Sequence, residues 1–442
     1  KGKLMKKTLL ALLIGIGMTS SVYADSLMEV YQQALQNDPA TLQTKAQKDA
    51  AFIDIDKSRS GLLPQVSLSL SANETFGDFE RSTNSASVNL SQSIYDRSVW
   101  VALDRAELVA SRADTTYANA MQNLIVRTVT SYFNTLQAQD DLEFARAEKR
   151  AIERQLEQTK QRFEVGLTAI TDVHEAQAQY DTSVAAEISA QNNVETNLEA
   201  LREITGAYYE SLNVLNTGSF SASMPSPNDI NNWLKLAEER NLQLMVANTS
   251  VDIAKYDIKN ARAGHYPSVS LSANASTSDN GSFIISTDGV ATPAGRANTY
   301  GIGLNVSVPL YTGGLVTANV DSAKYSFIAN SEERERIHRA VIRSVRSNYN
   351  DVKAAISRIK AFEQAVISAE RALKATEAGF DVGTRTIVDV LNSTRNLFDA
   401  RRNLSRVRCG YVTSMMSLKL AAGTLSEKDV SDIDQGLMAK QK

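Results

Sequence analysis

The sequence is poor in the residues that metal and redox sites require. It contains one cysteine, Cys409, and three histidines, His174, His265 and His338, with no metal-like spacing. A single cysteine cannot form an internal disulfide or a cysteine-based zinc site. The sequence also lacks a glycine-rich phosphate loop and the G-x-S-x-G and H-E-x-x-H motifs. We therefore predict no enzyme activity, with no catalytic residue, no cofactor and no metal.

An excess of charge of one sign is also missing. There are 47 basic and 50 acidic residues and no run of Lys or Arg beyond the N-terminus, which argues against nucleic-acid binding. Residues 1–24 combine a positive start, a short apolar stretch from Leu9 to Met18 and a small-x-small site ending at Ala24. This pattern predicts a cleaved secretion signal that is too short to span a membrane. Residues 1–4, before Met5, are an upstream extension or a cloning remnant.

What the chain does contain is a long internal repeat. Residues 163–178 read FEVGLTAITDVHEAQA, and residues 380–395 read FDVGTRTIVDVLNSTR, with six identical positions. The repeat offset is 203 residues before the first strand pair and 216–217 after it. A period of about 200 residues is too long for a solenoid and indicates a duplicated half. The extra residues of the second copy fall in a loop at 279–298.

The repeat defines the expected domain organisation. A first half covers residues 25–212, a linker covers 213–227, a second half covers 228–425, and a tail covers 426–442. Each half is expected to run helix, strand, strand, long helix, turn, helix. The turns are placed at Gly166 and Gly383. The strands are expected at about 64–74, 85–95, 267–276 and 299–309.

These four strands alternate apolar residues with Ser, Asn or Gly. For example, Val66, Leu68 and Leu70 alternate with serines over about ten residues, which is typical of a transmembrane barrel strand. A half-buried sheet of a soluble domain would also explain any single strand. Four strands cannot close a barrel, and open edges cannot lie in lipid. The sequence therefore predicts strands shared between two or three chains.

The helices are expected to be unusually long. Residues 316–378 contain no proline or glycine, so a continuous helix there would span roughly 95 Å at 1.5 Å per residue. Apolar residues recur every seven positions from Val345 to Leu373, as in a coiled coil. A soluble periplasmic coiled-coil scaffold remains an alternative for the helices alone. A porin-like passive channel or surface receptor remains the alternative for the strands alone.

Together, the signal sequence, the duplicated halves and the turn motifs resemble the outer membrane efflux protein family. The motifs are Leu62-Leu-Pro64, Gln161-Arg-Phe-x-Val-Gly166, Ile170-Thr-Asp-Val173 and the stretch from Val382 to Val390. The resemblance covers residues 25 to about 430. It implies a mainly α protein with a membrane β-barrel portion: a homotrimer with a twelve-stranded barrel in outer-membrane lipid and a periplasmic α-barrel. It further implies a passive exit duct for drug efflux and type I secretion, working with a periplasmic adaptor and an inner-membrane RND, ABC or MFS pump in a Gram-negative cell.

The resemblance also assigns roles to the two turns. They form the periplasmic entrance, and their adaptor-docking residues are Val165, Gly166, Leu167, Val382, Gly383 and Thr384. The gate residues are Gln161, Thr171, Asp172, Phe380, Thr384 and Arg385, with Arg385 reaching Asp172 and Thr171 of a neighbouring coil. Phe380 stands where the family usually has tyrosine, so one hydrogen bond of the gate is expected to be lost.

Asp389 and Asn392 are expected to line the constriction. In a trimer each position becomes a ring of three, and a carboxylate ring favours cations. The family pattern has two such rings, whereas Asn392 leaves this sequence with the ring at Asp389. By spacing, Arg385, Asp389 and Asn392 are expected to share one helix face. The alternative is an exposed Arg385–Asp389 pair on that helix, contributing only about 0.3–0.5 kcal/mol.

Overall fold

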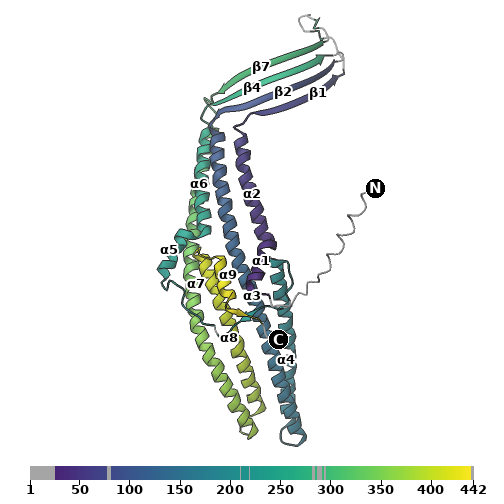
Figure 1. Cartoon of the computed structure of the whole chain (residues 1–442), viewed down its shortest axis with the longest axis vertical. Helices are drawn as coiled ribbons and strands as arrows, with labels where there is room; N and C mark the ends of the chain where they lie inside the picture. The colour runs from purple at the N-terminus through teal and green to yellow at the C-terminus, as the bar shows by residue number, and fades with distance from the viewer. Residues whose placement is uncertain are drawn as a thin grey trace, which may run out of the picture.

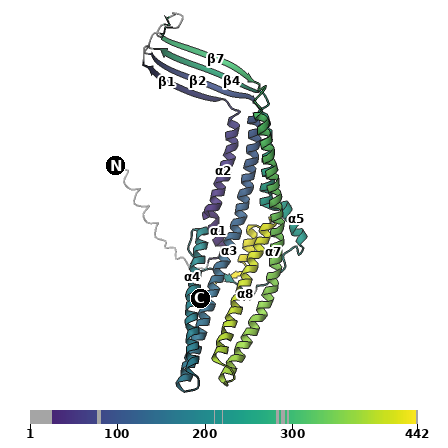
Figure 2. The same ribbon diagram turned by 180° about the vertical axis from the view of Figure 1, so that it is seen from behind.

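The computed structural model describes residues 25–76, 81–209, 211–218, 220–280, 284–285, 291–292 and 295–439. The predicted signal sequence at 1–24 therefore lies outside the described residues, as does half of the loop expected at 279–298, whose two ends belong to strands. Figures 1 and 2 show an elongated molecule with a strand sheet at one end and two helical hairpins at the other. Among the described helices, none is both long and apolar enough to cross a membrane.

Four long strands form one antiparallel sheet in the order β1-β2-β4-β7. Their bounds are β1 Gln65–Thr75, β2 Arg81–Asp96, β4 Ser268–Asn280 and β7 Gly295–Ser307. Two short strands, β5 (Ile284–Ile285) and β6 (Ala291–Thr292), pair beyond the end of this sheet. Strands β1 and β7 form the edges of the sheet, and within the described ranges each of them pairs with one strand only.

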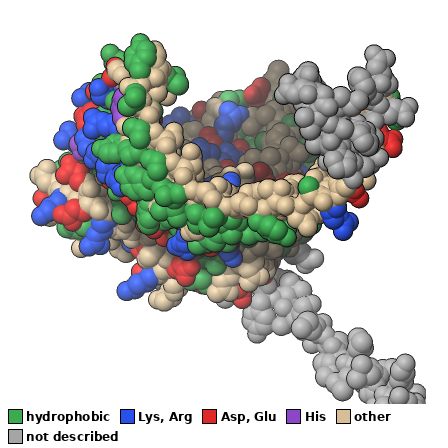
Figure 3. All heavy atoms as spheres, turned by 90° about the horizontal axis from the view of Figure 1, so that it is seen from above, with side chains coloured by type: hydrophobic (Ala, Val, Ile, Leu, Met, Phe, Trp, Pro, Cys, Tyr) green, Lys and Arg blue, Asp and Glu red, His purple; other side chains and the backbone are tan. Residues whose placement is uncertain are grey.

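The strand register places apolar side chains on one face of this sheet. Leu68 lies opposite Val88, and Leu271 lies opposite Leu304. Ser69 lies opposite Ser87, so serines occupy the other face. The apolar side chains are exposed, with Ile302 at 80%. Figure 3 shows them as a green band on the outer side of the curved wall.

Below the sheet, the wall consists of six helices. The long helices α3 (Arg97–Glu164) and α7 (Leu315–Asp381) contain 68 and 67 residues, or about 100 Å each. Helices α2 (Pro39–Ser60) and α6 (Leu242–Ala263) pack against their upper parts. Helices α4 (Ile170–Thr205) and α8 (Ile387–Ala421) pack against their lower parts (Figure 1). Each half therefore ends in an antiparallel helical hairpin.

Two helices precede the first strand of each half, where the sequence pattern predicted one. Helix α1 (Leu27–Asn37) ends at Asp38, and α5 (Ile230–Arg240) ends at Asn241. Both Asp38 and Asn241 also cap the following helix, accepting hydrogen bonds from the backbone N–H groups of Thr41 and Leu244. A cap of this kind satisfies free N–H groups at a helix start, so the chain turns without leaving them unpaired.

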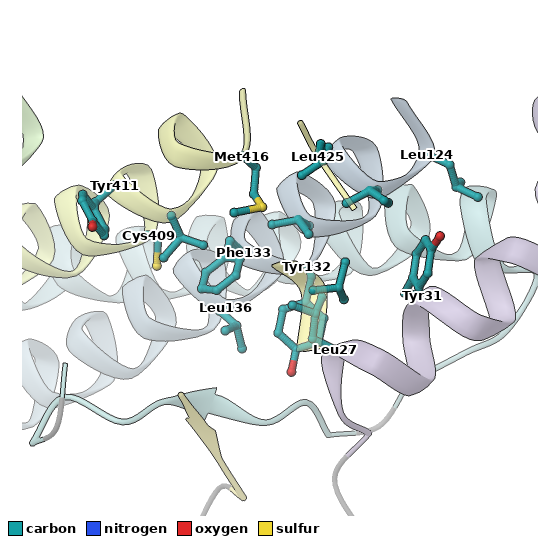
Figure 4. Packing of buried hydrophobic residues seen from close by; sticks show 14 of the residues in the cluster. Leu27, Tyr31, Leu124, Tyr132, Phe133, Leu136, Cys409, Tyr411, Met416 and Leu425 are labelled. Atoms are coloured by element: carbon teal, nitrogen blue, oxygen red, sulfur yellow. The ribbon is translucent and has the colours of Figure 1, made fainter. Parts of the chain in front are cut away.

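The main apolar core lies at the middle of the molecule. Helix α9 (Glu427–Asp434) and the short strands β3 (Val214–Leu215) and β8 (Leu437–Met438) surround it with α1 and the long helices. Figure 4 shows Tyr132 and Phe133 of α3 packed between Leu27 of α1 and Met416 of α8. Cys409 is also buried there, and burial raises the pKa of its thiol to about 12. A thiol that stays protonated is a poor nucleophile, so Cys409 serves as a packing residue.

Candidate functional site at the helical tips

The two hairpins end in turns of the same length. The first tip is residues 165–169, between α3 and α4, and the second tip is residues 382–386, between α7 and α8. Gly166 has a φ of 76° and Gly383 a φ of 77°, the left-handed conformation for which the sequence placed glycine there. A Cβ at either glycine would meet nothing within 4 Å, so backbone conformation is the reason for glycine at both turns.

The residues predicted to dock an adaptor are exposed at these tips. Leu167 and Val382 are each 75% exposed, and Val165 is 69% exposed. Thr384 is held in place because its hydroxyl donates a hydrogen bond of 3.0 Å to the carbonyl of Gly379. The two turns therefore present apolar side chains to the solvent.

Phe380 connects the two hairpins near their tips. Its ring is 8% exposed and lies in a small apolar cluster separate from the main core. The cluster combines side chains of α3, α4, α7 and α8: Ile152, Leu156, Ala176, Phe380, Ile387, Val390 and Leu391. The hydrophobic packing of Phe380 therefore acts within one chain, whatever else its position does in an assembly.

Arg162 makes a second connection between the hairpins, which the sequence did not indicate. Its guanidinium lies 4.4 Å from the centre of the Phe380 ring, within the range of a cation–π contact. It also donates hydrogen bonds to the Phe380 carbonyl at 3.5 Å and to the Asp381 carboxylate at 3.1 Å. The two residues are 219 positions apart in the sequence, so no local sequence pattern could indicate this ion pair.

Arg385 lies in the second tip and not on helix α8. The helix begins at Ile387 with Thr386 as its N-cap, so the expectation that Arg385 shares a helix face with Asp389 and Asn392 is wrong. The stem of Arg385 packs over Gly379, where an added Cβ would lie 2.8 Å from the arginine Cγ. Because Gly379 has no side chain, the stem of Arg385 can pack against α7 at this position.

The remaining predicted gate residues lie at the first tip. Asp172 accepts a short hydrogen bond from the hydroxyl of Thr168, and Thr171 is exposed. Gln161 donates to the side chain of Glu157 at 3.3 Å. Within the described part of this single chain, Arg385 and Asp172 form no ion pair with each other. The contact inferred from the resemblance was between coils of different chains.

Asp389 is fixed by a capping box at the start of α8. Its carboxylate accepts hydrogen bonds of 3.0 Å from both the amide and the hydroxyl of Thr386, while its own amide donates to that hydroxyl. These bonds, first from the Thr386 amide and then from its hydroxyl, lower the pKa of Asp389, and the nearby positive charge of Arg385 adds to the effect. Asn392, one turn further along α8, is exposed.

The tips combine exposed turns with contacts that connect the two hairpins. Two exposed turns end two helical hairpins, and near the tips an apolar cluster and Arg162 join these hairpins within the chain. Further from the tips, Arg402 of α8 forms an ion pair with Glu148 of α3. The charged side chains of Asp172, Arg385 and Asp389 lie at or beside the turns.

Comparisons with known proteins agree with this architecture. The outer membrane efflux protein family model matches residues 30–207 and 233–424. The chain is 48% identical to the outer membrane protein TolC of Vibrio cholerae, covering 96% of this chain and 97% of that protein. It is 44% identical to the outer membrane protein TolC of Escherichia coli, covering 98% and 89%. The Campylobacter jejuni CmeC outer membrane channel structure has a TM-score of 0.77 at 17% identity, covering 93% and 89%.

These findings define a non-enzymatic channel protein of the Gram-negative outer membrane, built from long helices and a four-stranded antiparallel sheet in each chain. The chain belongs to the outer membrane efflux protein family. Its function is that of an efflux channel of tripartite efflux and secretion systems. The resemblance noted in the turn motifs is thereby confirmed.

The contacts of Arg162 lead to a prediction about the second tip. Arg162→Ala should speed amide hydrogen exchange of residues 379–386 by about threefold to tenfold, because a cation–π contact and a partly exposed ion pair each contribute up to about 1 kcal/mol. Hydrogen-exchange mass spectrometry of the purified protein would measure this. Lys160→Ala, at an exposed position of the same helix, is the matched control and should leave exchange unchanged. Equal exchange in both variants would show that Arg162 does not hold the tip.

Proposed function

We propose that the chain works as a homotrimer whose three sheets close one twelve-stranded barrel. The observation that carries this proposal is that β1 and β7 are edge strands, with no second partner strand among the described residues. In lipid each unpaired backbone N–H or C=O group costs several kcal/mol, so both edges need a neighbour. The exposed apolar face of the same sheet supports a position in the membrane.

Below the barrel, the helices of three chains would form a continuous tube. Within one chain the wall runs α2, α3, α6, α7 in the upper part, so α2 and α7 are its free sides. These sides lie on the same flanks as β1 and β7 (Figure 1). A rotation that pairs β1 with β7 of the next chain would therefore also bring α2 against a neighbouring α7.

The exposed tips are the proposed docking points for a periplasmic adaptor. An inner-membrane pump of the RND, ABC or MFS class would supply the energy. The apolar side chains of Val165, Leu167 and Val382 already lie in solvent, so they are available for contact with another protein. The turns around Gly166 and Gly383 hold them in a defined conformation.

At the same end, Arg385 of one chain would form the closing contact with Asp172 and Thr171 of the next. Arg385 is exposed and has no ion-pair partner among the described residues of its own chain, which leaves its donors available. A planar guanidinium is suited to a carboxylate and a hydroxyl at once. Asp389 and Asn392 would then form two stacked rings in the constriction, with the charge carried by Asp389.

The assembly can be tested with cysteine pairs across the proposed chain boundary. Leu68→Cys on β1 combined with Leu304→Cys or Ile302→Cys on β7 should give disulfide-linked ladders that stop at three chains. Within one chain β1 and β7 lie three strand spacings apart, about 14 Å, which is too far for a disulfide. The single-cysteine variants are controls, and a native mass in mild detergent should equal three chains. A monomer with intact strands would contradict the architecture.

The constriction can be tested by changing charge without removing the cap of α8. Asp389→Asn should reduce cation preference in planar-bilayer recordings, and Asn392→Asp should increase it. Because hydrogen bonds from Thr386 lower the pKa of Asp389, the ring should stay charged to lower pH than a free carboxylate. Thr386→Val should therefore make cation preference disappear at a higher pH than in the parent channel. Unchanged selectivity in both charge variants would place positions 389 and 392 away from the pore.

The gate can be tested by asking whether changes at Arg385 and at Asp172 have additive effects on single-channel conductance. Arg385→Ser and Asp172→Ala should each raise single-channel conductance, and the double variant should raise it by less than the sum. Residues that share one interaction couple, whereas independent sites add. Lys160→Ala serves again as a control for charge loss near the tip. Parent-like conductance in Arg385→Ser would mean that the second tip docks an adaptor without closing the pore.

A further inference from the structure

The end of helix α6 differs in charge from the equivalent part of the first half. The two halves align here residue by residue, as residues 56–64 read DKSRSGLLP and residues 259–267 read KNARAGHYP. The glycine of each segment allows the same close packing. A Cβ at Gly61 would lie 3.1 Å from Val99, and one at Gly264 would lie 3.1 Å from Val316.

In the first half the positions equivalent to Lys259, Asp321 and Lys324 are acidic. Arg59 forms an ion pair of 2.8 Å with Asp56, and the facing helix α3 carries Asp104 and Glu107. At the four aligned positions 56, 59, 104 and 107, three residues are therefore acidic and one is basic, and the nearby Arg105 pairs with Asp257 of α6 at 2.5 Å. The neighbouring side chains Leu62, Leu63 and Trp100 are apolar.

The second half reverses this balance. Lys259 replaces Asp56, so Arg262 loses the acidic partner one turn before it, and Arg262 forms no ion pair within the described residues. On α7, Lys324 replaces Glu107, while Asp321 is retained and pairs with Lys324 at 2.8 Å. Three basic residues now accompany one acidic residue. His265 and Tyr266 replace the two leucines.

These substitutions surround a groove of about 420 Å³ between α6 and α7. Its lining combines two basic residues, one acidic residue, hydrogen-bond donors and an aromatic ring: Arg262, His265, Tyr266, Thr317, Val320, Asp321 and Lys324. Arginine and lysine together with hydroxyl donors are the groups that bind a phosphate ester. The groove therefore suits an anion larger than a single ion, with an apolar part beside it.

The position of the groove indicates which anion. Tyr266 stands two residues before β4, and the apolar face of the sheet begins at the pair Val269–Val306. Leu310 and Tyr311, in the connection from β7 to α7, are almost fully exposed. Exposed aromatic residues next to basic residues are typical of the boundary between lipid and water. Figure 3 shows Lys, Arg and His side chains gathered beside the apolar band on the outer side of the wall.

We propose that the α6–α7 groove binds the anionic phosphodiester headgroup of a phospholipid in the membrane leaflet nearest the helices. Arg262 and Lys324 bind the phosphate, Thr317 donates to it, and the acyl chains lie along the apolar face of the sheet above Tyr266. The first half lacks such a site because Glu107 replaces Lys324, leucines replace His265 and Tyr266, and Arg59, the equivalent of Arg262, pairs with Asp56. A trimer would therefore carry three headgroup sites, one for each chain.

Native mass spectrometry of the purified channel with short-chain phosphatidylglycerol and phosphatidylcholine would test this site. The parent channel should retain up to one phosphatidylglycerol per chain and less phosphatidylcholine. The variant Lys259→Asp/Lys324→Glu carries the residues of the first half, where the same backbone accepts them. It should bind phosphatidylglycerol about tenfold more weakly, because two attractive charges become repulsive.

A matched variant separates this site from general electrostatics. Lys353→Asp/Lys374→Glu makes the same change in total charge at exposed positions of α7 further from the sheet, and it should bind like the parent channel. Equal weakening in both variants, or equal binding of the two lipids, would overturn the proposal. Displacement of phosphatidylglycerol by inorganic phosphate at equal concentration would assign the groove to free phosphate. The trimer mass in the same spectra verifies folding of each variant.

Discussion

The hydrogen-bonding groups along β1 and β7 are the constraint on which the rest of the molecule depends. A four-stranded sheet with an exposed apolar face is stable neither in water nor, with open edges, in lipid. In the proposed trimer both edges pair with other chains, and the helices below then continue the same arrangement. Each strand pair is followed in the chain by a long helix, and this helix extends the wall from the sheet to the tips.

Duplication supplies the scaffold, and divergence between the copies supplies the function. Arg162 of the first half corresponds to Gly379 of the second, and Thr168 corresponds to Arg385. In the first half the arginine lies on the helix and reaches across to Phe380 and Asp381. In the second half the arginine lies in the turn, and the glycine makes room for its stem. One exchange therefore gives the first hairpin a contact within the chain and leaves the second hairpin an arginine for contacts outside it.

Local patterns carried most of the fold, since alternation of period two located the strands and the heptads located the long helices. They failed where local signals compete or contacts are remote. Thr386-x-x-Asp389 is a capping box, and recognising it would have placed Arg385 outside α8. The breaks at Asp38 and Asn241 are likewise caps within apparently continuous helices. The Arg162–Asp381 pair joins residues in different halves, and no periodicity within one segment can indicate it.

The capping box also links the charge of Asp389, proposed to line the pore, to the folding of α8. The hydrogen bonds that hold the Asp389 carboxylate at the start of the helix are the same ones that lower its pKa. A movement that opens the tip by unwinding the first turn of α8 would break them, and the pKa of Asp389 would return toward its ordinary value. A movement that tilts α8 as a rigid body would keep both the cap and the low pKa. The cluster around Phe380 includes Ile387, Val390 and Leu391 of that first turn, so packing favours the rigid movement. The carboxylate would then keep its charge while the distance between the chains changes.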